Sequence, residues 1–337
     1  MIKIDKKYIV GVDIGGTWIR VAVCTSDLDD RNIKIEVTHT LKENELSISS
    51  SVCELLNKLI LKTCIKKEEI IGIGLATAGP IDLEKGEVFN NANLGFDVIP
   101  LREPIKAEFP GIPIYLINDC NAAVLGVHYF EAQTDEKDNL AYVTMSTGIG
   151  GGVICNGHLI LGKEGNAVEI GHGVVEPRSP FICNCGAYGC WEVYSSGTGV
   201  RNRALYALRE RKLNSEILLG IVKNDREKIS AKKIFQAAQD GDDLSKKIVD
   251  DCVFYTKVGI GLINNFYDCT AIYMGGAMMN DSNQIIPPIR EQFELDPIRF
   301  TINHPPVIKV TSLKDDVGIR GALVLVKYKS ENHPVVC

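Results

Sequence analysis

Runs of apolar residues interrupted by glycine turns recur along the chain. The stretch "YIVGVDIGGTWIRVAVCT", residues 8–25, has two apolar runs joined by a glycine turn, which predicts a hairpin of two buried strands. The stretch "LAYVTMSTGIGGGVICNGHLI", residues 140–160, repeats this plan, and "IGG" occurs in both. The repetition predicts two related halves, each beginning with a β-meander that carries a glycine turn.

Helical and strand patterns alternate through the rest of the chain. The elements expected between the two hairpins are a helix at 49–64, a strand at 70–80, a strand at 112–119 and a helix at 121–132. Those expected beyond Glu192 are a helix at 231–241 capped by Ser230, a helix at 244–266, a strand at 270–279 and a closing helix at 315–329. The pattern favours an α/β protein of two domains. The expected first domain is 1–118, completed by the helix at 317–337, and the expected second is 119–316.

Composition and charge narrow the functional class. The chain has 337 residues, of which 45% are hydrophobic and 24% charged, as in ordinary globular proteins. No run approaches the ~18 apolar residues of a membrane span, so no membrane association and a cytoplasmic location are expected. A net charge of -6 argues against a nucleic-acid partner and favours a small-molecule enzyme. Most of the eleven cysteines lie singly in apolar stretches, which predicts reduced core thiols at Cys24, Cys53, Cys64, Cys120, Cys155 and Cys252.

The first glycine turn can bring chemistry to the end of a strand. Because Gly15 and Gly16 lack Cβ, backbone N–H groups there can approach an anion closely, and Thr17 adds a hydroxyl. Asp13, at the end of the first strand, can hold a hydrated Mg²⁺.

Two further glycine turns extend this pattern. Thr147 and Gly148 offer a comparable anion-binding turn in the second half, and Gly275 with Gly276 is a candidate adenosine contact. A single turn of this kind is more often a plain hairpin. Two of them, one with a strand-end carboxylate, favour a nucleoside triphosphate with its Mg²⁺.

The loop "FICNCGAYGCWE", residues 181–192, gathers Cys183, Cys185 and Cys190. Three soft ligands are one short of the tetrahedral set that a structural zinc needs. Free thiols are the alternative interpretation. The spacing alone leaves the fourth ligand open.

Six motifs together resemble the ROK family (repressors, open reading frames and kinases). They occur in the order and at about the spacing of that family, and they are "DIGGTWIR", "NDCNAA", "STGIGGG", "EIGH", "CNCGAYGCWE" and "MGGA". The resemblance covers nearly the whole chain. It implies a two-lobed actin-like ATPase fold, built from duplicated ribonuclease-H-like domains, with ATP and sugar in the cleft and a zinc-binding loop.

The resemblance also assigns residues. It makes Asp119 the general base, a position where an aspartate would otherwise be taken for an N-cap, and Asn118 a sugar contact. Further sugar contacts implied by the family are Asn93, Glu169, His172 and Glu192. His172 is also the implied fourth ligand of one structural Zn²⁺.

The expected function is therefore an ATP-dependent sugar kinase acting on the 6-hydroxyl of a hexose, with glucose favoured and a homodimer or homotetramer expected. Val168 is bulkier than the small residue frequent in the family before Glu169, and a 2-acetamido group needs volume there. The alternatives are an N-acetylmannosamine or N-acetylglucosamine kinase, a nucleotide switch of the actin-like kind and a non-catalytic sugar-sensing regulator. A repressor would need a helix-turn-helix domain, and only twelve residues precede Asp13.

Overall fold

The computed structural model describes residues 7–91, 94–210 and 215–331. Contacts between residues divide the chain into two compact units. The first unit comprises Met1–Asp138, Gly152–Val168 and Asp315–Cys337, and the second comprises Asn139–Gly151 and Glu169–Lys314.

A five-stranded sheet in the order β3-β2-β1-β4-β8 forms the centre of the first unit. Its strands are β1 (Tyr8–Ile14), β2 (Trp18–Thr25), β3 (Lys34–His39), β4 (Ile70–Thr77) and β8 (Ile114–Asn118). The expected first hairpin is confirmed, because β1 pairs antiparallel with β2 in a register that places Asp13 opposite Arg20. Strands β1, β4 and β8 run parallel, so their carboxyl ends lie at one edge of the sheet.

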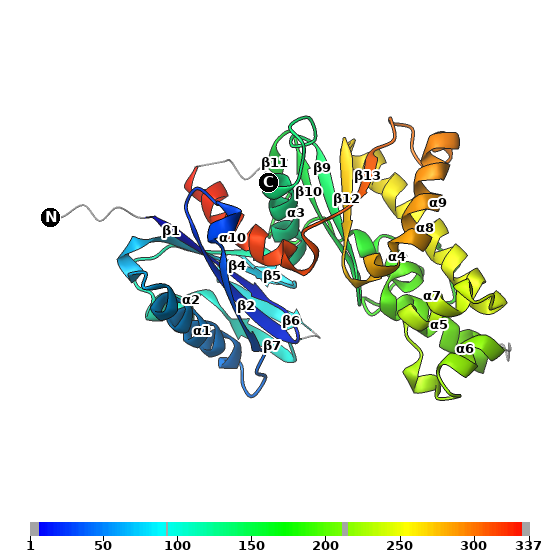
Figure 1. Ribbon diagram of the computed structural model, residues 1–337, viewed down its shortest axis with the longest axis horizontal. Coiled ribbons are helices and arrows are strands. Elements are labelled where there is room, and N and C mark those ends of the chain that lie inside the picture. The colour runs from blue at the N-terminus through cyan, green and yellow to red at the C-terminus, as the bar shows by residue number, and fades with distance from the viewer. Residues whose placement is uncertain (1–6, 92–93, 211–214, 332–337) are drawn as a thin grey trace. The chain divides into compact units, whose positions relative to one another are not determined.

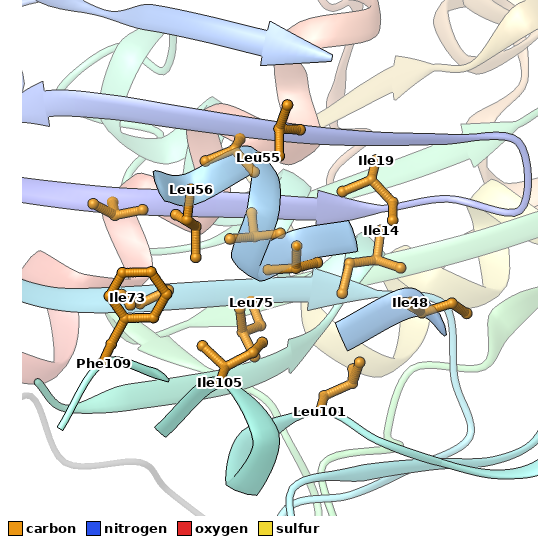
Figure 2. Close-up of a cluster of buried hydrophobic side chains, with 14 of the residues drawn as sticks. Ile14, Ile19, Ile48, Leu55, Leu56, Ile73, Leu75, Leu101, Ile105 and Phe109 are labelled. Carbon is orange, nitrogen blue, oxygen red and sulfur yellow. The ribbon is translucent and has the colours of Figure 1, made fainter. Parts of the chain in front are cut away.

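Helices cover both faces of this sheet. The helices of the first unit are α1 (Ser47–Thr63), α2 (Arg102–Glu108), α3 (Asp119–Phe130) and α10 (Val317–Ser330). Ile14 and Ile19 belong to the core that α1 and α2 build on one face, together with Leu55, Leu56 and Phe109 (Figure 2). Alternation along β1 turns Gly11 and Asp13 to the other face, towards α10.

Glycines let α10 approach the sheet and α3 very closely. A Cβ on Gly11 would lie 2.9 Å from the backbone nitrogen of Leu323, and one on Gly321 would lie 1.7 Å from the carbonyl oxygen of Ala122. The two helices therefore pack backbone against backbone. This packing explains why α3 belongs to the first unit, whereas the boundary expected near Asn118 would have put it in the second.

A small antiparallel sheet completes the first unit. Its strands are β5 (Ile81–Asp82), β6 (Glu87–Asn91) and β7 (Phe96–Pro100), and β5 is an edge strand.

The second five-stranded sheet has the order β11-β10-β9-β12-β13. Its strands are β9 (Leu140–Met145), β10 (Ile149–Cys155), β11 (His158–Leu159), β12 (Ala271–Gly275) and β13 (Val307–Val310). Because β9 and β10 are neighbours joined by three residues, the repeated strand-turn-strand plan is confirmed. The chain thus contains two five-stranded sheets that each include a glycine-turn hairpin (Figure 1).

Helices make up most of the second unit beyond the cysteine loop. They are α4 (Trp191–Ser195), α5 (Gly197–Arg209), α6 (Glu216–Ile221), α7 (Ala231–Gln239), α8 (Asp243–Tyr267) and α9 (Ser282–Leu295). Trp191 is 1% exposed and stacks on α8 where Gly259 leaves room, since a Cβ there would lie 2.5 Å from the indole. The cysteine loop is thereby anchored to the longest helix.

Ser230 is the N-cap residue of α7, as expected, and its carbonyl accepts from the N–H of Ile234 at 3.0 Å, although its hydroxyl makes no capping hydrogen bond. The prediction for Cys64 was wrong. Cys64 is exposed rather than in the core, because it is the residue that ends α1 in a left-handed conformation with φ of 55°. Among the described residues, every helix is too short or too polar to cross a lipid bilayer.

Candidate functional site

Two carboxylates lie at the carboxyl edge of the first sheet. Asp13 lies near the end of β1, and Asp119 directly follows β8, the strand on the far side of β4. Asn118, not Asp119, is the N-cap of α3, since its Oδ1 accepts from the backbone N–H of Cys120 at 2.8 Å. The capping interpretation of Asp119 is therefore unnecessary, and the amide nitrogen of Asn118 stays available to a ligand.

The surroundings of these carboxylates favour their protonated forms. Burial, and then the negative charge of Asp119, raise the pKa of Asp13 to about 7, whereas the charge of Arg20 acts in the opposite direction. Burial also raises the pKa of Asp119 against the hydrogen bond from the Cys120 N–H. A divalent cation near these carboxylates would be stabilised, and its charge would favour their ionised forms.

Arg20 and α10 enclose Asp13. Arg20 stands opposite Asp13 in the hairpin and lies 3.6 Å from Asp316, the residue that precedes α10. The first turn of α10 passes over the carboxylate so closely that a Cβ on Gly318 would lie 3.2 Å from it. The sequence analysis identified neither Arg20 nor Gly318 as a neighbour of Asp13, although the register of a short hairpin could have identified Arg20.

The first glycine turn is held by a residue of the following segment. The N–H of Gly15 donates to the carbonyl of Trp18 at 2.9 Å, which closes the turn. Thr40 donates its hydroxyl to the carbonyl of Gly15 at 2.7 Å and its N–H to that of Thr17 at 2.9 Å. Gly16 and Thr17 thus form the tip of a braced turn, which is the geometry that the anion-binding prediction requires.

Glu192 joins the second glycine turn to the cysteine loop. One carboxylate oxygen accepts from the backbone N–H of Ile149 at 2.8 Å, and a Cβ on Gly148 would lie 2.4 Å from that oxygen. The other carboxylate oxygen lies 3.8 Å from the thiol of Cys183. Gly148 is therefore required for Glu192 to reach the turn, and Thr147 remains exposed at its tip.

The three thiols and the imidazole of His172 form one cluster. Their four candidate ligand atoms all lie within 4.8 Å of one another. Sγ of Cys185 and Cys190 are 3.6 Å apart, and Sγ of Cys183 is 3.5 Å from Nδ1 of His172. Ligands on a tetrahedral zinc are about 3.6–3.8 Å apart, so the donor set fits this metal, with Nε2 of His172 left for another partner.

Burial affects the protonation that a metal at this cluster would have to change. Without a cation it raises the pKa of Cys190 to about 12, so this thiol stays protonated at neutral pH. A bound zinc would have to displace that proton, because the thiolate is the ligand.

A cavity of about 600 Å³ lies beside the second glycine turn, within the second unit. Its lining comes from the turn, the start of α5, the start of α7 and the 3-10 helix Ala277–Asp281. Its polar residues include Ser146, Thr147, Thr198, Arg201, Ser230, Lys232, Asn280 and Asp281. The size is that of a small-molecule site. Ser230, whose hydroxyl makes no capping hydrogen bond to α7, contributes to this wall.

The remaining predicted residues lie as follows. Gly275 and Gly276 directly precede the cavity wall at Ala277; Gly275 packs against the ring of Tyr142, and Gly276 has a φ of 87°. Glu169 is exposed and precedes the 3-10 helix that carries His172. Asn93 lies outside the described residues.

Comparisons with known proteins identify the family. The ROK family model matches residues 9–329. A glucokinase of Halalkalibacterium halodurans is 30% identical over 97% of this chain and 97% of its own. A glucokinase of Thermotoga maritima is 32% identical over 96% of this chain and 98% of its own.

A solved structure gives the same result at the level of the fold. A ROK family glucokinase of Streptomyces griseus, in complex with glucose and AMPPNP, superposes with a TM-score of 0.74 at 27% identity, over 95% of this chain and 99% of that one. The expected actin-like fold is confirmed by this agreement. The chain belongs to the ROK family.

Proposed function

We propose that the protein is an ATP-dependent sugar kinase that phosphorylates the 6-hydroxyl of a hexose, with glucose favoured. The observation that carries the proposal is the pair of carboxylates, Asp13 and Asp119, at the carboxyl ends of β1 and β8, two parallel strands of one sheet with β4 between them. The glucokinase relatives support this reaction class. Phosphoryl transfer needs a base at the attacking hydroxyl and a cation at the phosphates, and two separate carboxylates can serve these two needs.

Asp119 is the proposed general base. A base needs a pKa below the working pH but high enough to take a proton from a hydroxyl. Burial raises the pKa of Asp119 and so makes it a stronger base. Asn118 would hold the sugar beside it, because the cap of α3 uses its Oδ1 and leaves its N–H groups. Glu169, His172, Glu192 and Asn93 are proposed as further sugar contacts on the family resemblance alone.

Asp13 and the two glycine turns are proposed to bind Mg·ATP. Mg²⁺ would supply positive charge that neutralises the phosphates. On the family resemblance, Gly15, Gly16 and Thr17 are proposed as phosphate contacts, and so are Thr147 and Gly148. The cavity of about 600 Å³, with Gly275 and Gly276 behind its wall, is proposed to take the nucleoside.

The zinc proposal concerns order rather than reaction. A site with four protein ligands has no open position, so its role would be to fix the "EIGH" segment against the cysteine loop. His172 and Glu192 are then held relative to one another.

Glucose is proposed as the preferred sugar because of Val168. This residue is 8% exposed and has a φ of 68°, which is an unfavourable conformation for a β-branched residue. Its fixed bulk precedes Glu169 and would disfavour a 2-acetamido group.

Incubation with Mg·ATP and a panel of hexoses tests the reaction and the substrate. We expect glucose 6-phosphate to form, with N-acetylmannosamine and N-acetylglucosamine used less efficiently. Efficient use of an N-acetylhexosamine and poor use of glucose would overturn the sugar preference. Absence of phosphorylation across the panel, with sugar still bound, would instead favour a sugar-sensing regulator.

Asp13→Asn tests the cation site and the cost of its charge. The folded-state pKa of Asp13 is raised from 3.8 to about 7, so the folded protein binds the proton more tightly than the unfolded chain. Stability should therefore fall as pH rises between about 4 and 7, and the variant should lose part of this slope and melt at a higher temperature at pH 8. Use of Mg·ATP should weaken while sugar binding is retained. Asp240→Asn, at an exposed position, is the control. An unchanged pH slope with unchanged ATP dependence would remove Asp13 from this role.

Cys185→Ser tests the zinc. Atomic emission should find about one zinc per chain in the native protein and a large loss in the variant. The KM for sugar should rise steeply and the KM for ATP much less. The reason is that loss of the metal would disorder His172 and Glu192, which are proposed sugar contacts. Cys64→Ser, at an exposed cysteine outside the cluster, should change neither value. A metal-free native protein, or unaltered sugar affinity in Cys185→Ser, would contradict the proposal.

A further inference from the structure

The segment Ala78–Ile81, which follows β4, is held by asparagines from two distant parts of the chain. Asn91 donates its amide to the carbonyls of Ala78 at 3.2 Å and Gly79 at 2.6 Å. Asn166 accepts from the N–H of Ile81 at 2.9 Å and donates to its carbonyl at 2.8 Å. Every one of these partners is a main-chain group, so the side chains fix the backbone path itself.

Asn166 makes the hydrogen bonds to Ile81 that a neighbouring strand would make. Ile81 begins β5, an edge strand whose other side pairs with β6 through Val88. A two-way exchange with one residue's N–H and carbonyl is the pattern of an antiparallel pair. A single side chain of the 161–168 loop thus occupies the open edge that β5 presents.

The loop that carries Asn166 is fitted to this position. Gly165 has a φ of 84°, and a Cβ there would lie 2.5 Å from the side chain of Leu83. The N–H of Ala167 closes the loop on the carbonyl of Leu161 at 3.1 Å. The loop therefore docks on residues 81–83 at two points, through a close packing contact and through the amide of Asn166.

The clamped segment lies against Asn118. A Cβ on Gly79 would be 3.3 Å from Nδ2 of Asn118 and 3.4 Å from Oδ1 of Asn166. Asn118 is already fixed on its other side by the cap of α3. The backbone at Gly79 therefore borders the amide nitrogen of Asn118, which is the proposed sugar contact. The position of this backbone depends on the hydrogen bonds from Asn166 to Ile81.

We propose that Asn166 is a positioning residue for the sugar, acting through Gly79 on the space in front of Asn118. The inference rests on the proposed sugar-kinase function. It assigns Asn166 no contact with the reacting atoms. A side chain that served only the fold would affect stability without a selective effect on the sugar.

Asn166→Ala and Asn166→Gln test the proposal with two readouts. Hydrogen exchange of the peptide covering residues 78–83 should be faster in Asn166→Ala, because the N–H of Ile81 loses its acceptor. The KM for the best hexose should rise about ten-fold, the scale of one or two lost hydrogen bonds, with kcat and the KM for ATP within about three-fold of the parent. Asn166→Gln keeps both amide groups and should recover part of the sugar affinity.

Asn265→Ala is the matched control. Asn265 also clamps backbone, since it accepts from the N–H of Ile302 at 3.0 Å and donates to the carbonyl of Phe300 at 3.1 Å, but it lies in the second unit. It should leave the KM for sugar unchanged.

Two results would overturn the inference. Unchanged exchange at residues 78–83 would show that Asn166 does not hold the segment, and faster exchange with unaltered sugar KM would show that the clamp serves only the fold. Failure of the parent protein to phosphorylate any hexose would instead contradict the proposed function, and it would be seen before any variant is made.

Discussion

The central physical constraint is that two carboxylates, Asp13 and Asp119, lie at one poorly solvated edge of the first sheet. Parallel pairing of β1, β4 and β8 brings Asp13 and Asp119 to one sheet edge, and burial together with their mutual repulsion disfavours ionisation of Asp13. Such an arrangement costs stability in the free protein. Two features accompany it: glycines let α10 pack closely on the sheet and on α3, and Arg20 supplies one compensating charge. A bound cation with its phosphates would relieve the repulsion between the carboxylates. The free energy lost in the free protein would then be regained when the charged substrate binds.

In the second unit, the carboxylate of Glu192 connects two segments of the chain. Glu192 accepts from the glycine turn at Ile149 and lies against Cys183, so it links the turn, the cysteine loop and the start of α4. Trp191, next to it, anchors the same segment on α8. Loss of order at the four-ligand cluster would therefore first affect Glu192, which is a proposed sugar contact.

Local patterns in the sequence predicted the parts that depend on neighbours along the chain. Alternation around the glycine turns predicted both hairpins, and cysteine spacing together with the family resemblance predicted the cluster of three cysteines and His172. Long-range hydrogen bonds left no such signal. Thr40 braces a turn 25 residues away, and Asn166 clamps a segment 85 residues away, although each looks like an ordinary loop residue. The unit boundary was missed for a similar reason, since the contact of α3 with α10 depends on single glycines far apart in sequence.

The most direct test of this account is one variant, Asp119→Asn, measured for stability, sugar binding and turnover at pH 8. Removal of the Asp119 charge, which disfavours ionisation of Asp13, should raise the melting temperature, and sugar binding should be retained because Asn118 keeps its place. Turnover should fall by about 10²-fold or more, because the base for the hydroxyl is lost. Near-normal turnover, or a lower melting temperature together with lost sugar binding, would contradict the claim that this pair of carboxylates is maintained for phosphoryl transfer at the expense of stability.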